Sequence, residues 1–114
     1  MVNKKPDTHF DQFSSLDIRV GTIVEAGIFK EARHPAYLLK IDFGPLGVLK
    51  SSAQITALYE PESVLGKQII AVVNFPPKQI ANIMSECLVL GALNNGEVSL
   101  LKPDLQVANG TSIA

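Results

Sequence analysis

The chain has 114 residues, of which 46% are hydrophobic, a content that suits one compact domain with a modest core. Its 10 Lys and Arg residues are balanced by 11 Asp and Glu residues, which gives a formal net charge of -1. A protein that binds nucleic acid mainly by neutralising phosphates would be basic, so contact with a polyanion would have to use a local patch.

Composition also favours a cytoplasmic, non-catalytic protein. The single cysteine, Cys87, lies in an apolar run, so we expect a buried thiol rather than a disulfide or a metal ligand. We expect no membrane insertion, because the N-terminus has no apolar stretch and nowhere do about 18 apolar residues follow one another. No glycine-rich phosphate loop, carboxylate pair or Ser-His-Asp set can be identified, so neither an enzyme nor a cofactor is expected.

The N-terminal part predicts a flexible arm and then one long strand. Residues 1–9 are polar and contain a proline, so we expect an arm before a single domain at 10–114. From 16 to 28 the even positions are mostly apolar, which predicts a strand with one buried face and with Ile23 pointing outward. Two glycines inside this span offer places for a bend, which would let the strand pair on both sides.

Two further strands and a helix are predicted next. Alternating apolar residues predict strands over 36–43 and 48–51, joined by a Gly-Pro-Leu-Gly turn. Ser51 and Gln54 form a capping-box pattern, and the apolar spacing that follows predicts a short helix that ends before Pro61. Another helical turn is expected to begin at Pro61.

The second half predicts a fourth and a fifth strand and, with them, the fold. Continuous apolar residues over 69–73 predict a central strand that is covered on both faces. Residues 88–93 and 98–101 flank an Asn-Gly turn signal and predict a hairpin. This order indicates an all-β protein with short helices, namely an OB-fold: a five-stranded Greek-key barrel with the helix between strands three and four. Such barrels bind ligands on strands two and three and on the loops after strands one and four.

The loop after the fourth strand is the main candidate site. Lys78 lies in a proline-braced segment and could contact a phosphate. Asn74, Gln79 and Ser85 offer donors and acceptors for base edges or for a peptide backbone. Glu86 would repel phosphate, so we expect it to accept amide hydrogen bonds that hold the loop, or to contact a base or peptide donor.

The same loop carries an apolar set that permits two interpretations. Ile80, Ile83 and Met84 have helical spacing and predict a helical turn that packs on the barrel. Alternatively, together with Phe75 and Pro76, they form an adaptable surface for unfolded peptides.

Cations and outward apolar residues add two further expectations. Four cations lie in the loop after the first strand and on strands two and three, where they form either a local basic strip or ordinary solvated charges: Lys30, Arg33, Lys40 and Lys50. Apolar side chains outside the core, with Val107 and Ile113 in the tail, favour a homodimer, since most small oligomers are two-fold.

Several separated motifs resemble the tRNA-binding domain that occurs free-standing and appended to aminoacyl-tRNA synthetases. From residue 10 to the C-terminus they are Asp17-Ile18-Arg19-Val20-Gly21, Tyr59-x-Pro61-Glu62, Gly66-Lys67, Asn74-Phe75-x-Pro77-Lys78 and Ser85-Glu86. Within that family the runs at 50–56 and 71–77 most resemble the CsaA group of export-related bacterial chaperones.

The resemblance implies an OB-fold homodimer that binds tRNA in many relatives and, in the CsaA group, unfolded preprotein segments destined for the secretion machinery. In the family the loop after strand four grips RNA, which carries over to five residues here: Asn74, Pro77, Lys78, Ser85 and Glu86. Synthetase-linked relatives often have two cations after the proline, whereas here Gln79 follows Lys78, a loss of about one phosphate contact. We therefore expect peptide binding first and tRNA or structured-RNA binding second.

Overall fold

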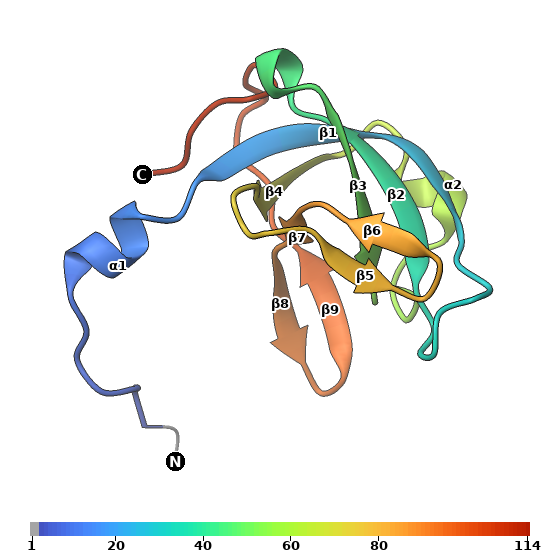
Figure 1. The fold of residues 1–114 in the computed structure, drawn as a ribbon, viewed down its shortest axis with the longest axis horizontal. Coiled ribbons are helices and arrows are strands. Elements are labelled where there is room, and N and C mark those ends of the chain that lie inside the picture. The colour runs from blue at the N-terminus through green and yellow to red at the C-terminus, as the bar shows by residue number, and fades with distance from the viewer. Residues whose placement is uncertain (1–2) are drawn as a thin grey trace.

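The structure is a computed structural model in which residues 3–114 are described (Figure 1). Two short helices, one 3-10 helix and nine strands follow one another along the described chain. They are α1 (Phe10–Ser14), β1 (Ile18–Ile28), β2 (Tyr37–Asp42), η1 (Gly44–Leu46), β3 (Val48–Ala53), α2 (Pro61–Val64), β4 (Gln68–Val72), β5 (Lys78–Ile80), β6 (Ile83–Ser85), β7 (Leu88–Val89), β8 (Gly91–Asn94) and β9 (Glu97–Leu100).

Five antiparallel strands form the main sheet in the order β3-β2-β1-β4-β7. The long strand β1 pairs with β4 through its first half and with β2 through its second half, as predicted. The expectation that 69–73 would be central is wrong, because β1 holds the middle and β4 lies between β1 and β7. The sheet curls until β3 approaches β7, so the predicted OB-fold barrel is confirmed.

A bulge in β1 reverses its alternation. The pairing with β2 shifts between Ile23 and Glu25, so the residue between them stands outside the regular ladder. Ile23, just before the bulge, is 0% exposed and Val24 is 46% exposed, so the prediction that Ile23 points outward is wrong. Beyond the bulge, Glu25 and Gly27 belong to the outer face of the barrel.

The first predicted helix is absent, whereas the second is confirmed. β3 continues to Ala53, and the Ser51 hydroxyl donates to the Cys87 carbonyl instead of capping a helix. The capping box occurs later, between Glu60 and Ser63 of α2. The strand prevails at 51–53 because its pairing with β2 satisfies a run of main-chain groups, while a cap satisfies only one or two.

The loop after β4 contains a hairpin rather than the predicted helical turn. Lys78 pairs with Ser85 and Ile80 with Ile83, so β5 and β6 form a separate two-stranded sheet. Ala81 at its tip has a φ of 49°. The apolar spacing that suggested a helix places Ile80 and Ile83 opposite each other across a two-residue turn instead.

The predicted Asn-Gly hairpin is confirmed at its turn, but residues 88–93 are divided between β7, which pairs with β4, and β8, which pairs with β9. The chain ends are anchored unequally. β8 and β9 join through Asn95 and Gly96, both with positive φ, as an Asn-Gly hairpin requires. The C-terminal segment returns to β1, where the Val20 amide donates to the Thr111 carbonyl. Residues 3–9 are exposed and stand with α1 apart from the barrel (Figure 1). Residues 1–2 of the predicted arm lie outside the described part of the chain, so its flexibility stays a prediction.

Candidate ligand-binding site

Hollows on the outer face of the barrel adjoin the loop at 29–36 and the β5–β6 hairpin. The strand hollow, of about 270 Å³, is lined by Glu25, Ala26, Gly27, Leu38, Leu39, Lys40, Lys50 and Ile83. The hairpin groove consists of two adjoining hollows of about 380 and 670 Å³, which share Ser52, Gln54, Lys78 and Ile80. This is the ligand face of an OB-fold, where strands two and three meet the two binding loops.

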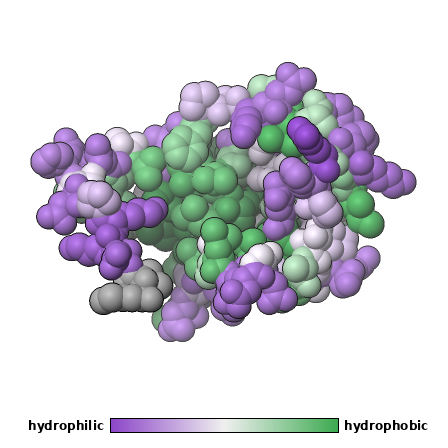
Figure 2. All heavy atoms as spheres, turned by 90° about the horizontal axis from the view of Figure 1, so that it is seen from below, coloured by the Kyte–Doolittle hydropathy of each residue, from purple (hydrophilic) through white to green (hydrophobic). Residues whose placement is uncertain are grey.

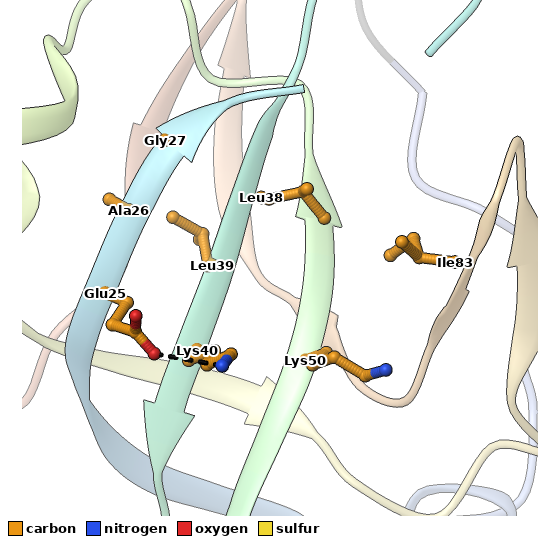
Figure 3. A pocket seen from close by; sticks show the side chains of 8 residues that line it. All are labelled: Glu25, Ala26, Gly27, Leu38, Leu39, Lys40, Lys50 and Ile83. Atoms are coloured by element: carbon orange, nitrogen blue, oxygen red, sulfur yellow. Dashed lines mark ion pairs between the residues drawn. The ribbon is translucent and has the colours of Figure 1, made fainter. Parts of the chain in front are cut away.

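The strand hollow has an aliphatic side and a charged side. Gly27 pairs with Leu38, and Leu38 faces Ile83 of the hairpin across the hollow (Figure 3). One row along the sheet, Lys40 pairs with Glu25 on one side and with Lys50 on the other. Lys40 forms an ion pair with Glu25, with Nζ 3.1 Å from Oε2.

That arrangement leaves one positive charge uncompensated beside the strand hollow. Two lysines directly opposite each other repel, and a single carboxylate neutralises only one of them. Within residues 3–114 no carboxylate lies in ion-pair contact with Lys50. Lys50 is therefore the cation of the strand hollow that is available to an anionic group.

The hairpin groove changes character along its length. Phe75, Pro76 and Leu88 make one end apolar, and both Phe75 and Leu88 are exposed. The other end lies between the loop after β1 and the hairpin, where Arg33 and Lys78 contribute cations. A groove of this shape can accept an elongated ligand with apolar and polar parts.

The closure of the barrel beside this groove relies on side-chain as well as main-chain hydrogen bonds. The Glu86 carboxylate accepts a hydrogen bond from the Lys50 amide at 2.9 Å, and the Glu86 amide donates to the Lys50 carbonyl at 2.8 Å. The Ser85 hydroxyl accepts a hydrogen bond from the Ser52 amide at 3.1 Å. We call this set of contacts between β3 and residues 85–87 the seam. The expected role of Glu86 in holding the loop by accepting an amide hydrogen bond is confirmed.

Asn74 also has a structural position. Its Oδ1 accepts from the Asp17 amide at 2.8 Å, and its Nδ2 donates to the Ser15 carbonyl at 2.9 Å. Both ends of this amide thus brace the entry to β1. Neither Asn74 nor Pro77 lines the hollows of the ligand face.

The structure gathers most of the remaining predicted site residues. Met84 is exposed but lines none of these hollows. Ten predicted residues besides Lys78 do line them: Arg33, Lys40, Lys50, Phe75, Pro76, Gln79, Ile80, Ile83, Ser85 and Glu86.

Sequence reasoning missed several residues that line these hollows. Ser52 and Gln54 were assigned to the edge of a helix, and Gly27 and Leu38 were not considered as site residues. One available signal was the alternation of β2, which places Leu38 and Lys40 on the face opposite the core. The alternation of β1 gave the same signal, because it placed Glu25 and Gly27 at the outward positions.

Cys87 has the predicted buried, unreactive character. Burial raises the pKa of its thiol to about 12, although a hydrogen bond with Ser51 acts in the opposite direction. The thiol therefore remains protonated near neutral pH, and a thiolate nucleophile is not available there. Within residues 3–114, no group of three His, Cys, Asp or Glu side chains could hold a metal ion, and no helix is long and apolar enough to cross a membrane.

Comparisons with known proteins place the chain in a family. The sequence profile of the tRNA binding domain matches residues 18–112. The solved structure of chaperone CsaA from Bacillus anthracis has a TM-score of 0.92 and 53% identity, covering 96% of this chain and 100% of that one. The CsaA chaperone protein from Picrophilus torridus has a TM-score of 0.90 and 54% identity, covering 95% and 100%.

A curated relative shows the same domain inside a larger protein. Methionine-tRNA ligase of Methanothrix thermoacetophila is 38% identical over 112 residues, which are 98% of this chain but 16% of the ligase. The chain thus spans only a small fraction of the length of that ligase. The family profile covers most of the chain, and the similarity to the two CsaA structures extends over their full length. The chain belongs to the tRNA binding domain family.

Proposed function

We propose that the protein is a non-catalytic chaperone of the CsaA type, which binds unfolded preprotein segments in the cytoplasm for the secretion machinery. The observation that carries this proposal is the ligand face itself. Aliphatic side chains line one side of its strand hollow. The apolar end of its hairpin groove consists of Phe75, Pro76 and Leu88, of which Phe75 is exposed. Burial of apolar side chains is the interaction that distinguishes unfolded from folded polypeptide.

The polar groups of the ligand face favour peptide over RNA. Three residues expected to contact RNA, namely Asn74, Ser85 and Glu86, direct side-chain groups to internal hydrogen bonds. Lys40 is neutralised by Glu25. The cations left on this face are Arg33, Lys50 and Lys78, enough for about three phosphate contacts and hence for only a moderate salt-dependent attraction.

Similarity to chaperones supports the same choice. Both CsaA structures are more than half identical to this chain and are named as chaperones. Their similarity extends over nearly all of this chain. The transfer of bound segments to the secretion machinery rests on this relationship.

Exposed apolar surface supports the homodimer. Phe10 is 78% exposed, and Phe13 and Leu105 are exposed as well. Seen from below the view of Figure 1, apolar side chains gather in a broad hollowed area (Figure 2). A helix of only five residues such as α1 is marginal in water without a packing partner. A second copy that covers this surface would bury it and would place two ligand faces in one particle.

Binding of tRNA or another structured RNA is the second candidate. Membership of the tRNA binding domain family and the cations along the groove favour it. On this alternative Arg33, Lys50 and Lys78 contact phosphates, and the exposed amide of Gln79 contacts a base edge.

A titration at two salt concentrations tests the two candidates. The ligands are an unstructured apolar peptide and a tRNA, and the variants are Phe75→Ala and Lys78→Ala. Peptide binding should depend little on salt and should weaken in Phe75→Ala. RNA binding should weaken steeply as salt rises, with a shallower slope in Lys78→Ala. Tight, salt-sensitive binding of tRNA together with no binding of peptide would contradict the chaperone proposal.

A further inference from the structure

Gly27 lies inside β1, although neither its backbone nor its packing requires glycine. Its φ lies outside the left-handed region, and a Cβ added there would meet no atom within 4 Å. Gly21 in the same strand is different, because its Cβ would lie 2.7 Å from the side chains of Ile41 and Phe43. A glycine inside a strand weakens it and often marks a place where a ligand or another backbone approaches closely. The fold therefore leaves the glycine at 27 unexplained.

The surroundings of Gly27 show what the missing side chain leaves open. Its partner across the ladder is Leu38, so a side chain at 27 would stand beside Leu38 on the outer face. Ile83 lies on the other side of the strand hollow (Figure 3). A side chain at 27 would occupy the margin of this hollow without disturbing the core.

The chemistry of the hollow identifies its occupant. No aromatic side chain lines it, so it offers no platform on which a nucleobase could stack. Leu38 and Ile83 match an aliphatic side chain, and the open backbone at Gly27 admits an extended main chain. Lys50, the cation of this hollow that is not paired with Glu25, complements a carboxylate.

We propose that an unfolded segment crosses the barrel over Gly27, places an aliphatic side chain between Leu38 and Ile83, and directs a neighbouring carboxylate to Lys50. The absence of a side chain at Gly27 keeps this subsite open for the peptide main chain. The preferred segments combine an aliphatic residue with an acidic one. This inference rests on the proposed function and names the class of peptide that it selects.

The test uses labelled, unstructured peptides built from Gly-Ser-Leu-Glu repeats, with one control peptide in which Gln replaces Glu. The protein variant is Gly27→Val, and Ala92→Val adds similar bulk to an exposed position of β8 that lines none of these hollows. Gly27→Val should weaken peptide binding roughly tenfold or more, the order expected for loss of one buried aliphatic side chain. Its thermal midpoint should be unchanged or higher, because a β-branched residue favours a strand. Ala92→Val should leave peptide affinity unchanged.

A second pair of measurements examines the charge. Lys50→Gln should remove the preference for the Glu peptide over the Gln peptide, because the carboxylate then has no cation to meet. Gly27→Ala adds a single methyl group and should show a smaller loss of affinity, which keeps the test valid if the valine variant does not fold.

The outcomes separate this inference from the proposed function. Wild-type binding that Gly27→Val leaves intact would overturn the inference but not the chaperone function. Failure of the wild-type protein to bind any of the peptides would contradict both. Loss of tRNA binding in Gly27→Val, with peptide binding unchanged, would assign the hollow to RNA and would also overturn the inference.

Discussion

Removal of the Glu86 carboxylate should weaken the barrel at the seam. In Glu86→Ala the Lys50 amide loses the acceptor that lies 2.9 Å away. A hydrogen bond to a charged group contributes about 1.5–3 kcal/mol, and we expect about 1–2 kcal/mol here because water can reach the exposed Lys50. For a domain of this size that loss lowers the melting temperature by about 4–8 °C. Glu86→Gln keeps an acceptor oxygen and should lose less.

The assay is thermal and urea unfolding at one fixed protein concentration, since a dimer's stability depends on concentration. Glu97→Ala is the matched control, because it removes the same charge from an exposed strand residue with no side-chain hydrogen bond in the described structure. Amide exchange at Lys50 should accelerate in Glu86→Ala and not in the control. Equal stability of Glu86→Ala and Glu97→Ala, with unchanged exchange at Lys50, would refute the role of the seam.

Three further predictions concern the core, the thiol and the assembly. Gly21→Ala should lower the free energy of unfolding by about 1–3 kcal/mol in urea titrations, because its methyl group would overlap Ile41 and Phe43; unchanged stability would contradict this packing. The Cys87 thiol should resist a thiol reagent until the protein unfolds, and rapid labelling of the folded protein would disprove its burial. The free energy of unfolding should fall as pH rises from 9.0 toward about 12, because the unfolded state releases the thiol proton at lower pH than the folded state does. Phe10→Ser should shift the protein toward monomer in sedimentation velocity, and an unchanged assembly would show that α1 lies outside the interface.

Local signals in the sequence predicted the order of the main strands and one hairpin well. The Asn-Gly turn at 95–96 requires positive φ at both positions, and few other sequences adopt that conformation easily. The proline at position 61 begins a helical turn for a similarly local reason, since its fixed φ suits the first position of a helix. Such features depend on neighbours along the chain and can be recognised without the fold.

Features that depend on distant partners could not be predicted in this way. The bulge in β1 lies at Val24 rather than at a glycine, two residues beyond Thr22, where the strand passes from β4 to β2. The apolar spacing at 80–84 fits a helical turn as well as a hairpin, and only contact with β3 decides between them.

The candidate site shows the same division between local and distant information. The loop after β4 was recognised from its prolines and cation, and it does border the hairpin groove. The hydrogen bonds of Asn74 and Glu86 join positions 57 and 36 residues apart, so their structural role was hidden from local patterns. Gly27 was visible as a strand glycine, but its free space becomes apparent only when Leu38 and Ile83 are placed beside it.

The side chains of Ser85 and Glu86 complete the cylinder where a continuous strand ladder would otherwise do so. A single substitution in the seam can therefore change the stability of the barrel closure without altering the strand pairings elsewhere. Successive substitutions at these positions could therefore change the width of the hairpin groove in small steps while the rest of the fold is retained.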